Sequence, residues 1–61
     1  MEMKIGKKYK LKFIVGEKRE VVYFTGLITS LENSQIEFID IFGMKLKFPR
    51  AELISILEVS N

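Results

Sequence analysis

The chain has 61 residues, enough for one small domain. It contains neither cysteine nor histidine, which excludes disulfides and the usual zinc sites as sources of stability. A composition with 48% hydrophobic and 30% charged residues must therefore rely on dense apolar packing, on self-association, or on both.

The charges are distributed unevenly around a small net charge of +2. Residues 1–19 hold seven cations against two carboxylates, a net charge of +5, whereas residues 20–61 carry a net charge of −3. Such an asymmetry predicts an anionic partner for one face. The alternative is that the lysines keep a surface strand soluble and discourage pairing between sheet edges.

Residues 1–8 are short and charged, and we expect a flexible lead-in there before a β domain over residues 9–59. No apolar run follows the first lysines, so the sequence does not predict a signal peptide. The apolar runs are also far shorter than the ~18 residues of a membrane-spanning helix. We therefore expect a cytoplasmic protein with no membrane partner.

Residues 9–15 read YKLKFIV and alternate in polarity, which predicts an amphipathic strand with Lys10 and Lys12 on its outer face. Gly16 opens a polar break of the hairpin type. Residues 20–31 are rich in β-branched and aromatic side chains and predict a long second strand. Gly26 in its middle indicates a sharp bend or the close approach of another backbone. The broken alternation after Ile28 indicates a bulge or the strand end.

Three further strands are predicted over residues 35–41, 44–48 and 53–59. Asn33 and Ser34 are typical turn residues before the first of them. Residues 49–52 have the right length for one 3₁₀ turn, which begins at Pro49. The last strand should pair with the first and close the sheet. The predicted core comprises Leu11, Phe13, Phe24, Ile28, Ile36, Phe38, Leu46, Phe48, Leu53 and Ile56, with Met44 continuing the same alternation. The predicted fold is all-β, a single five-stranded antiparallel SH3-like barrel with a 3₁₀ turn before the last strand.

Two stretches support a resemblance to a known family. Residues 24–28 (FTGLI), followed by a polar turn and an apolar strand, resemble the first half of the Sm-like pattern. Residues 38–56 (FIDIFGMKLKFPRAELISI) are similar to the second half of many small barrels. The Sm-like family includes the bacterial RNA chaperone of the host-factor type. Its RNA pocket uses an Asp and an Asn near the turn after the second strand, where this chain has Glu32 and Asn33. The resemblance implies an Sm-like barrel, RNA binding and assembly by strand pairing.

The sequence shows no catalytic pattern. No serine lies in a nucleophile motif, and the four glycines are isolated rather than grouped in a phosphate-binding loop. Glu37 and Asp40 could form an acid pair, but a solvated outer face explains them better. We therefore expect a non-enzymatic protein with no catalytic residues, no metal, no cofactor and no small-molecule substrate.

The candidate site is a basic outer face that binds nucleic acid, RNA before DNA. Lysines two apart on a strand lie about 7 Å from one another and can follow a phosphate backbone, while exposed aromatic rings can stack on bases. The predicted site residues are Lys10, Lys12, Tyr23, Phe42, Lys45, Lys47 and Arg50. The alternative is that Tyr23 packs on a neighbouring strand and the lysines are merely solvated.

A surplus of apolar residues remains once the core is filled. The residues expected to face outward are Ile14, Val21, Tyr23, Leu27, Ile39, Ile41 and Leu57. Monomers rarely expose so many adjacent apolar groups, so we expect a homo-oligomer. The same surplus supports a rival function, a protein-interaction or assembly module with no nucleic-acid role and a contact patch of Tyr23, Leu27, Ile39 and Phe42.

Overall fold

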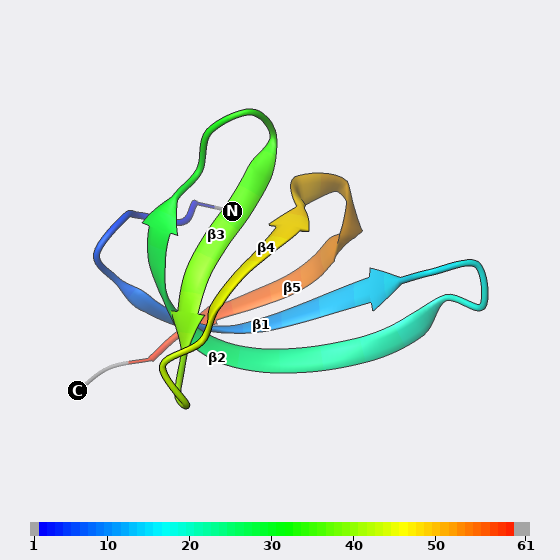
Figure 1. Cartoon of the computed structure of the whole chain (residues 1–61), viewed down its shortest axis with the longest axis horizontal. Helices are drawn as coiled ribbons and strands as arrows, with labels where there is room; N and C mark the ends of the chain where they lie inside the picture. The colour runs from blue at the N-terminus through cyan, green and yellow to red at the C-terminus, as the bar shows by residue number, and fades with distance from the viewer. Residues whose placement is uncertain (1, 60–61) are drawn as a thin grey trace.

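A computed structural model describes residues 2–59 of the chain and contains five strands and one 3₁₀ turn in that range (Figure 1). The elements are β1 (Lys8–Val15), β2 (Glu20–Ser30), β3 (Gln35–Asp40), β4 (Lys45–Pro49), the 3₁₀ turn η1 (Arg50–Glu52) and β5 (Leu53–Glu58). Every predicted strand is present, and each predicted end lies within one residue of the observed one.

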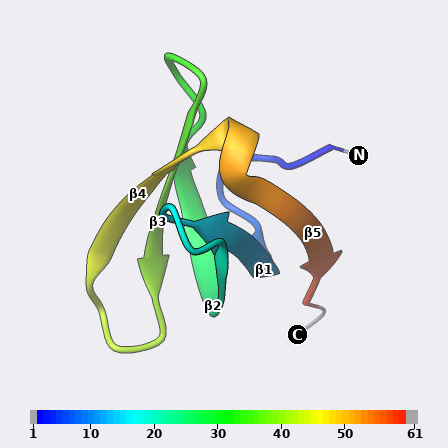
Figure 2. The same ribbon diagram turned by 90° about the vertical axis from the view of Figure 1, so that its right-hand side faces the viewer.

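The strands form one antiparallel sheet in the order β4-β3-β2-β1-β5. The all-β fold with five antiparallel strands is thus confirmed, as are the pairing of β5 with β1 and the 3₁₀ turn before β5. Figure 2 shows η1 joining the ends of β4 and β5. Among the described residues, β4 and β5 are the two edges and do not pair with each other. The sheet is therefore curved but not closed by strand pairing.

The tight turns follow the chemistry of their residues. Asn33 and Ser34 have φ values of 58° and 57°, and the N–H of Gln35 donates to the carbonyl of Glu32 across them at 3.1 Å. Positive φ at both central residues is the hairpin turn whose twist matches that of the flanking strands. Gly43 has a φ of 82° in the β3–β4 turn, a conformation that favours glycine.

β2 is the strand that both halves of the sheet share (Figure 1). It pairs with β1 from Glu20 to Leu27 and with β3 from Gly26 to Ser30, so the two pairings overlap at only two residues. The register with β3 shifts between Ile28 and Ser30, which agrees with a bulge, one of the two alternatives predicted there. Gly26 is buried, and a Cβ there would lie 2.5 Å from Cδ2 of Phe38. The glycine thus permits the close approach that its position predicted.

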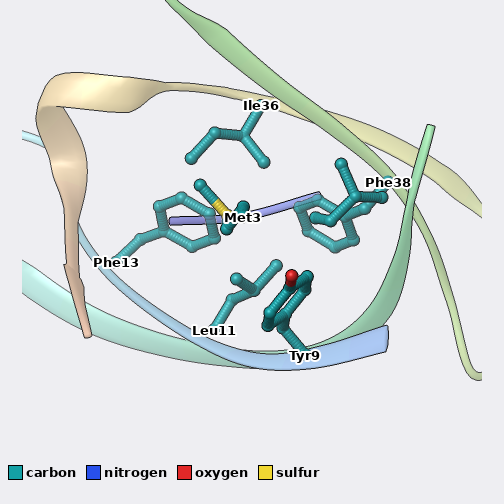
Figure 3. Close-up of a cluster of buried hydrophobic side chains, with 7 residues drawn as sticks. Met3, Tyr9, Leu11, Phe13, Ile36 and Phe38 are labelled. Atoms are coloured by element: carbon teal, nitrogen blue, oxygen red, sulfur yellow. The ribbon is translucent and has the colours of Figure 1, made fainter. Parts of the chain in front are cut away.

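The core lies on the concave face of the sheet (Figure 3). Four phenylalanines from four strands meet there: the rings of Phe13 and Phe48 stack with centroids 4.4 Å apart, and Phe24 lies 5.5 Å from Phe38. The fully buried residues include Phe13 and Phe38, as predicted. The remaining predicted core residues are either buried or packed against this cluster.

The predicted lead-in is part of the packed structure. Met3 is only 8% exposed and lies among the core side chains (Figure 3). The N–H of Lys4 donates to Oη of Tyr9 at 2.8 Å, and Gly6 and Lys7 exchange backbone hydrogen bonds with Ile28. A domain boundary at residue 9 therefore leaves out a segment that the structure packs onto the sheet. Residue 1 lies outside the described residues.

The outward-facing apolar residues agree with the prediction in most cases. Val21, Tyr23, Leu27, Ile41 and Leu57 are exposed, whereas Ile14 and Ile39 are half-buried. One expectation was wrong: Met44 is exposed and precedes β4 instead of continuing its inward face. The β3–β4 turn includes residues 41–43, so the alternation of β4 begins only after the chain has left that turn.

Candidate nucleic-acid interface

The outer face of β1 carries a row of three lysines, Lys8, Lys10 and Lys12. Their cross-strand neighbours on β2 are Leu27, Thr25 and Tyr23, respectively. Side chains two apart on a strand lie on the same face, about 7 Å from each other. Lys8 was not among the predicted site residues because the lead-in was expected to include it. Its even spacing from Lys10 and Lys12 is the sequence feature that identifies it as part of the row.

Tyr23 and Lys12 form the best-defined contact of this face. The ammonium nitrogen of Lys12 lies 5.5 Å from the centroid of the Tyr23 ring, within the range of a cation–π interaction. Tyr23 is 71% exposed, so one side of its ring remains open to solvent. The pair thus places a cation and an aromatic plane next to each other on the surface.

The surface is hollowed where β3 leaves β2, beyond the pair Gly26–Asp40. One hollow has a volume of about 460 Å³ and is lined by Lys8, Thr25, Gly26, Leu27, Ile39, Asp40 and Ile41. A second, of about 250 Å³, is lined by Lys10, Leu11, Tyr23, Phe24, Thr25 and Ile41. The two share Thr25 and Ile41 and have lysines of the β1 row on their borders, so an extended ligand could follow the row and insert a planar or apolar group.

The lysines of β4 are in a different electrostatic environment. Nζ of Lys45 lies 3.4 Å from Oε2 of Glu37, and Nζ of Lys47 lies 3.9 Å from its Oε1. The Thr29 hydroxyl donates to the same carboxylate at 3.0 Å. This hydrogen bond, with the charges of the two lysines, holds the pKa of Glu37 below its ordinary value despite partial desolvation. Glu37 therefore stays ionised at neutral pH and offsets part of the β4 charge.

The seven predicted site residues do not form one cluster. Among residues 2–59, the lysines of the β1 row have no ion-pair partner, whereas both β4 lysines share Glu37. In the sheet order, β2 and β3 separate β1 from β4, which corresponds to about 14 Å along the sheet. Arg50 begins η1, and its N–H donates to the carbonyl of Ser34 at 2.8 Å.

Phe42 lies at the β3–β4 turn and is 82% exposed. The Asp40 carboxylate accepts hydrogen bonds from the backbone N–H groups of Phe42 and Met44, each at 2.9 Å. An aspartate that caps a turn in this way fixes the turn backbone. Phe42 is therefore presented to solvent by an ordered turn, separate from the β1 row.

The described part of the chain offers little for other chemistry. Between residues 2 and 59, no three acidic, cysteine or histidine side chains gather as a metal site would require. The same stretch contains no helix long and apolar enough to cross a membrane. Comparisons with protein-family models, with curated proteins and with solved structures found no match for this chain.

Proposed function

We propose that this chain is a small, non-enzymatic, cytoplasmic protein that binds RNA or another single-stranded nucleic acid through the outer face of β1. The observation that supports the proposal most is the row of Lys8, Lys10 and Lys12, which has no carboxylate partner among residues 2–59 and borders the exposed ring of Tyr23. Single-strand binding combines cations that follow the phosphate backbone with aromatic rings on which the bases stack.

The predicted residues do not contribute equally to the proposed binding surface. Lys10, Lys12 and Tyr23 form the centre, and Lys8 joins them. Lys45 and Lys47 contribute less because both pair with the Glu37 carboxylate, which offsets part of their charge. Phe42 and Arg50 are peripheral. The binding surface is thus narrower than the seven residues suggest.

We also propose that the curved sheet is an SH3-like barrel of the Sm-like type. The strand order β4-β3-β2-β1-β5, the bent β2 and the 3₁₀ turn before the last strand support this assignment. The Phe cluster lies between the two halves of the sheet as a barrel core does. Such a barrel leaves the outer face of β1 available for a ligand.

Fluorescence anisotropy with a labelled single-stranded RNA of mixed sequence tests the binding. Each neutralised phosphate of a single strand contributes about −0.7 to the slope of log affinity against log salt, so three lysines give a slope of about −2. Between about 50 and 200 mM salt, the affinity should then fall about twentyfold. No binding at the lower salt concentration would refute the proposal.

Matched double substitutions locate the surface. Replacing Lys10 and Lys12 with glutamine leaves one contact, so the same salt increase should weaken binding only about threefold. Replacing Lys45 and Lys47 with glutamine removes the same formal charge and should leave the slope close to that of the unsubstituted chain. An equal effect of the two pairs would show that only net charge matters.

A second candidate function is a protein-interaction or assembly module, and the exposed apolar side chains favour it. Tyr23, Leu27 and Phe42 are exposed, and Ile39, the cross-strand partner of Leu27, is half-buried. A patch of this kind typically marks an interface. In either case we propose that the chain forms a homo-oligomer. RNA titration separates the two functions, and sedimentation measures self-association independently.

A further inference from the structure

The two edges of the sheet differ in how they are protected. At the β4 edge, the N–H of Asp40 donates to the carbonyl of Met44 at 2.9 Å. By the alternation of an antiparallel ladder, Lys45, Lys47 and Pro49 then direct their backbone groups away from β3. Proline has no N–H to offer, and lysines discourage another strand from pairing. The β4 edge is therefore unsuited to sheet extension.

The β5 edge lacks these devices. The N–H of Val59 donates to the carbonyl of Lys8 at 2.9 Å, so by alternation Leu57 and Ser55 also bond to β1, up to the register shift between Ser55 and Leu53. The backbone groups of Ile56 and Glu58 consequently point away from β1, and no partner strand lies there among residues 2–59. Leu57 is 62% exposed beside them. An unprotected, largely apolar edge is a template for another strand.

We propose that a second copy of the chain occupies this edge, with the two β5 strands paired antiparallel about a twofold axis at Leu57. In this register the free N–H and C=O groups of Ile56 in one copy form hydrogen bonds with those of Glu58 in the other. The twofold axis generates the same pair of hydrogen bonds on the other side of Leu57. The two Leu57 side chains meet in a non-hydrogen-bonded pair, where side chains approach most closely. A register centred on Ser55 would instead have to extend the ladder across the register shift between Ser55 and Leu53 and into η1, where the strand has ended.

Self-complementarity is the reason to choose a second copy over another partner. Each β5 offers a donor and an acceptor on two residues that flank one exposed leucine. An identical strand satisfies all of these groups and covers that leucine. The interface is isologous, so the assembly is complete with two copies. The β5 edge of each copy is then paired and no longer exposed.

The dimer joins the two lysine rows into one surface. Lys10 is the cross-strand neighbour of Leu57, so the outer face would run from Lys10 through both leucines to the second Lys10. Three strand spacings separate the two rows, about 14 Å. This consequence rests on the proposed nucleic-acid function, whereas the dimer itself requires only that the chain self-associates.

A cysteine placed at the axis tests the register. The chain contains no cysteine, so Leu57→Cys introduces a single thiol. Cα atoms of a non-hydrogen-bonded antiparallel pair lie about 4.5 Å apart, which is within the range of a disulfide. Mild oxidation should convert Leu57→Cys to a covalent dimer on a non-reducing gel. Glu17→Cys is the matched control and should remain largely monomeric, because Glu17 is exposed in the β1–β2 hairpin, beyond the part of β1 that pairs with β5.

A charge at the axis tests the energetics. In Leu57→Lys two cations face each other across the dyad, and sedimentation should show a rise of about tenfold or more in the dimer dissociation constant. Glu17→Lys in the exposed β1–β2 hairpin, which is assigned to no contact, should leave the constant unchanged, and circular dichroism checks that both variants fold. If the unsubstituted chain stays monomeric up to about 1 mM, self-association itself fails. If it associates but the two cysteine variants cross-link equally, only the β5 pairing is wrong.

Discussion

Replacing Gly26 with alanine tests the closest approach in the fold. The new Cβ would lie 2.5 Å from Cδ2 of Phe38, 2.9 Å from the carbonyl oxygen of Ile39 and 3.2 Å from Cγ of Phe38. Neither neighbour can move easily, since Ile39 contributes backbone and Phe38 is fully buried in the phenylalanine cluster. The backbone at Gly26 does not require positive φ, so the whole cost is steric.

Overpacking of a core costs about 1–3 kcal/mol, and two immobile neighbours place this case near 3 kcal/mol. Since a stable domain has a free energy of unfolding of about 5–15 kcal/mol and small ones lie at the low end, more than half of it would be lost. The melting temperature should fall by about 12–24 °C. Equilibrium urea unfolding followed by circular dichroism measures the free energy, and a thermal scan measures the temperature.

Two variants make the test discriminating. Gly16→Ala has nothing within 4 Å of the new Cβ but a φ of 77°, so it should cost only the left-handed conformation, about 1 kcal/mol. Phe38→Leu combined with Gly26→Ala should cost less than the sum of the two single changes, because the smaller side chain removes the clash. Equal costs for Gly26→Ala and Gly16→Ala, or strict additivity in the double variant, would refute the reasoning.

Three further predictions follow from contacts described above. Met3→Ala should lower the free energy of unfolding by about 2 kcal/mol in urea titration, whereas the exposed Glu2→Ala should leave it unchanged; equal effects would contradict the packing of the first segment. The Thr29 hydrogen bond and two lysines lower the pKa of Glu37. The stabilising contribution of this carboxylate is therefore present above its unfolded-state pKa and is lost as pH falls through its folded-state pKa. The urea midpoint of unfolding should drop in acid, and Glu37→Gln should flatten that pH dependence. Asp40→Ala removes the acceptor of two backbone N–H groups, so it should cost about 1–2 kcal/mol and speed amide exchange in the β3–β4 turn, and unchanged exchange there would show that the turn does not need the carboxylate.

Local patterns were sufficient to predict the strands. Alternation of polarity determines which face of a strand is buried, and this is why Phe13 and Phe38 could be assigned to the core from spacing alone. Gly26 could be interpreted as a close approach because a glycine inside an apolar strand removes a side chain where one is expected. Asn33 and Ser34 predicted the tight turn because their side chains suit such backbone.

Features that depend on distant segments could not be predicted. Met3 lies in a charged segment with no periodicity, and its burial depends on the space above a core that four later strands build. The pairing of Glu37 with Lys45 and Lys47 depends on the β3–β4 register, so the sequence could not distinguish these cations from the lysine row on β1. Met44 was misassigned because the alternation could not show where the turn ends.

The sharing of β2 between two pairings affects how the molecule comes apart. β5 and β1 are joined to β3 and β4 through this one strand, and a lone two-stranded hairpin is marginal in water. Neither half is therefore expected to survive as an independent fragment. Deuterium should enter the slowest amides of β1 and β3 at a common rate, set by opening of the whole molecule. Chain cleavage within β2 should abolish both halves at once, whereas a nick at residues 17–18 leaves every ladder intact.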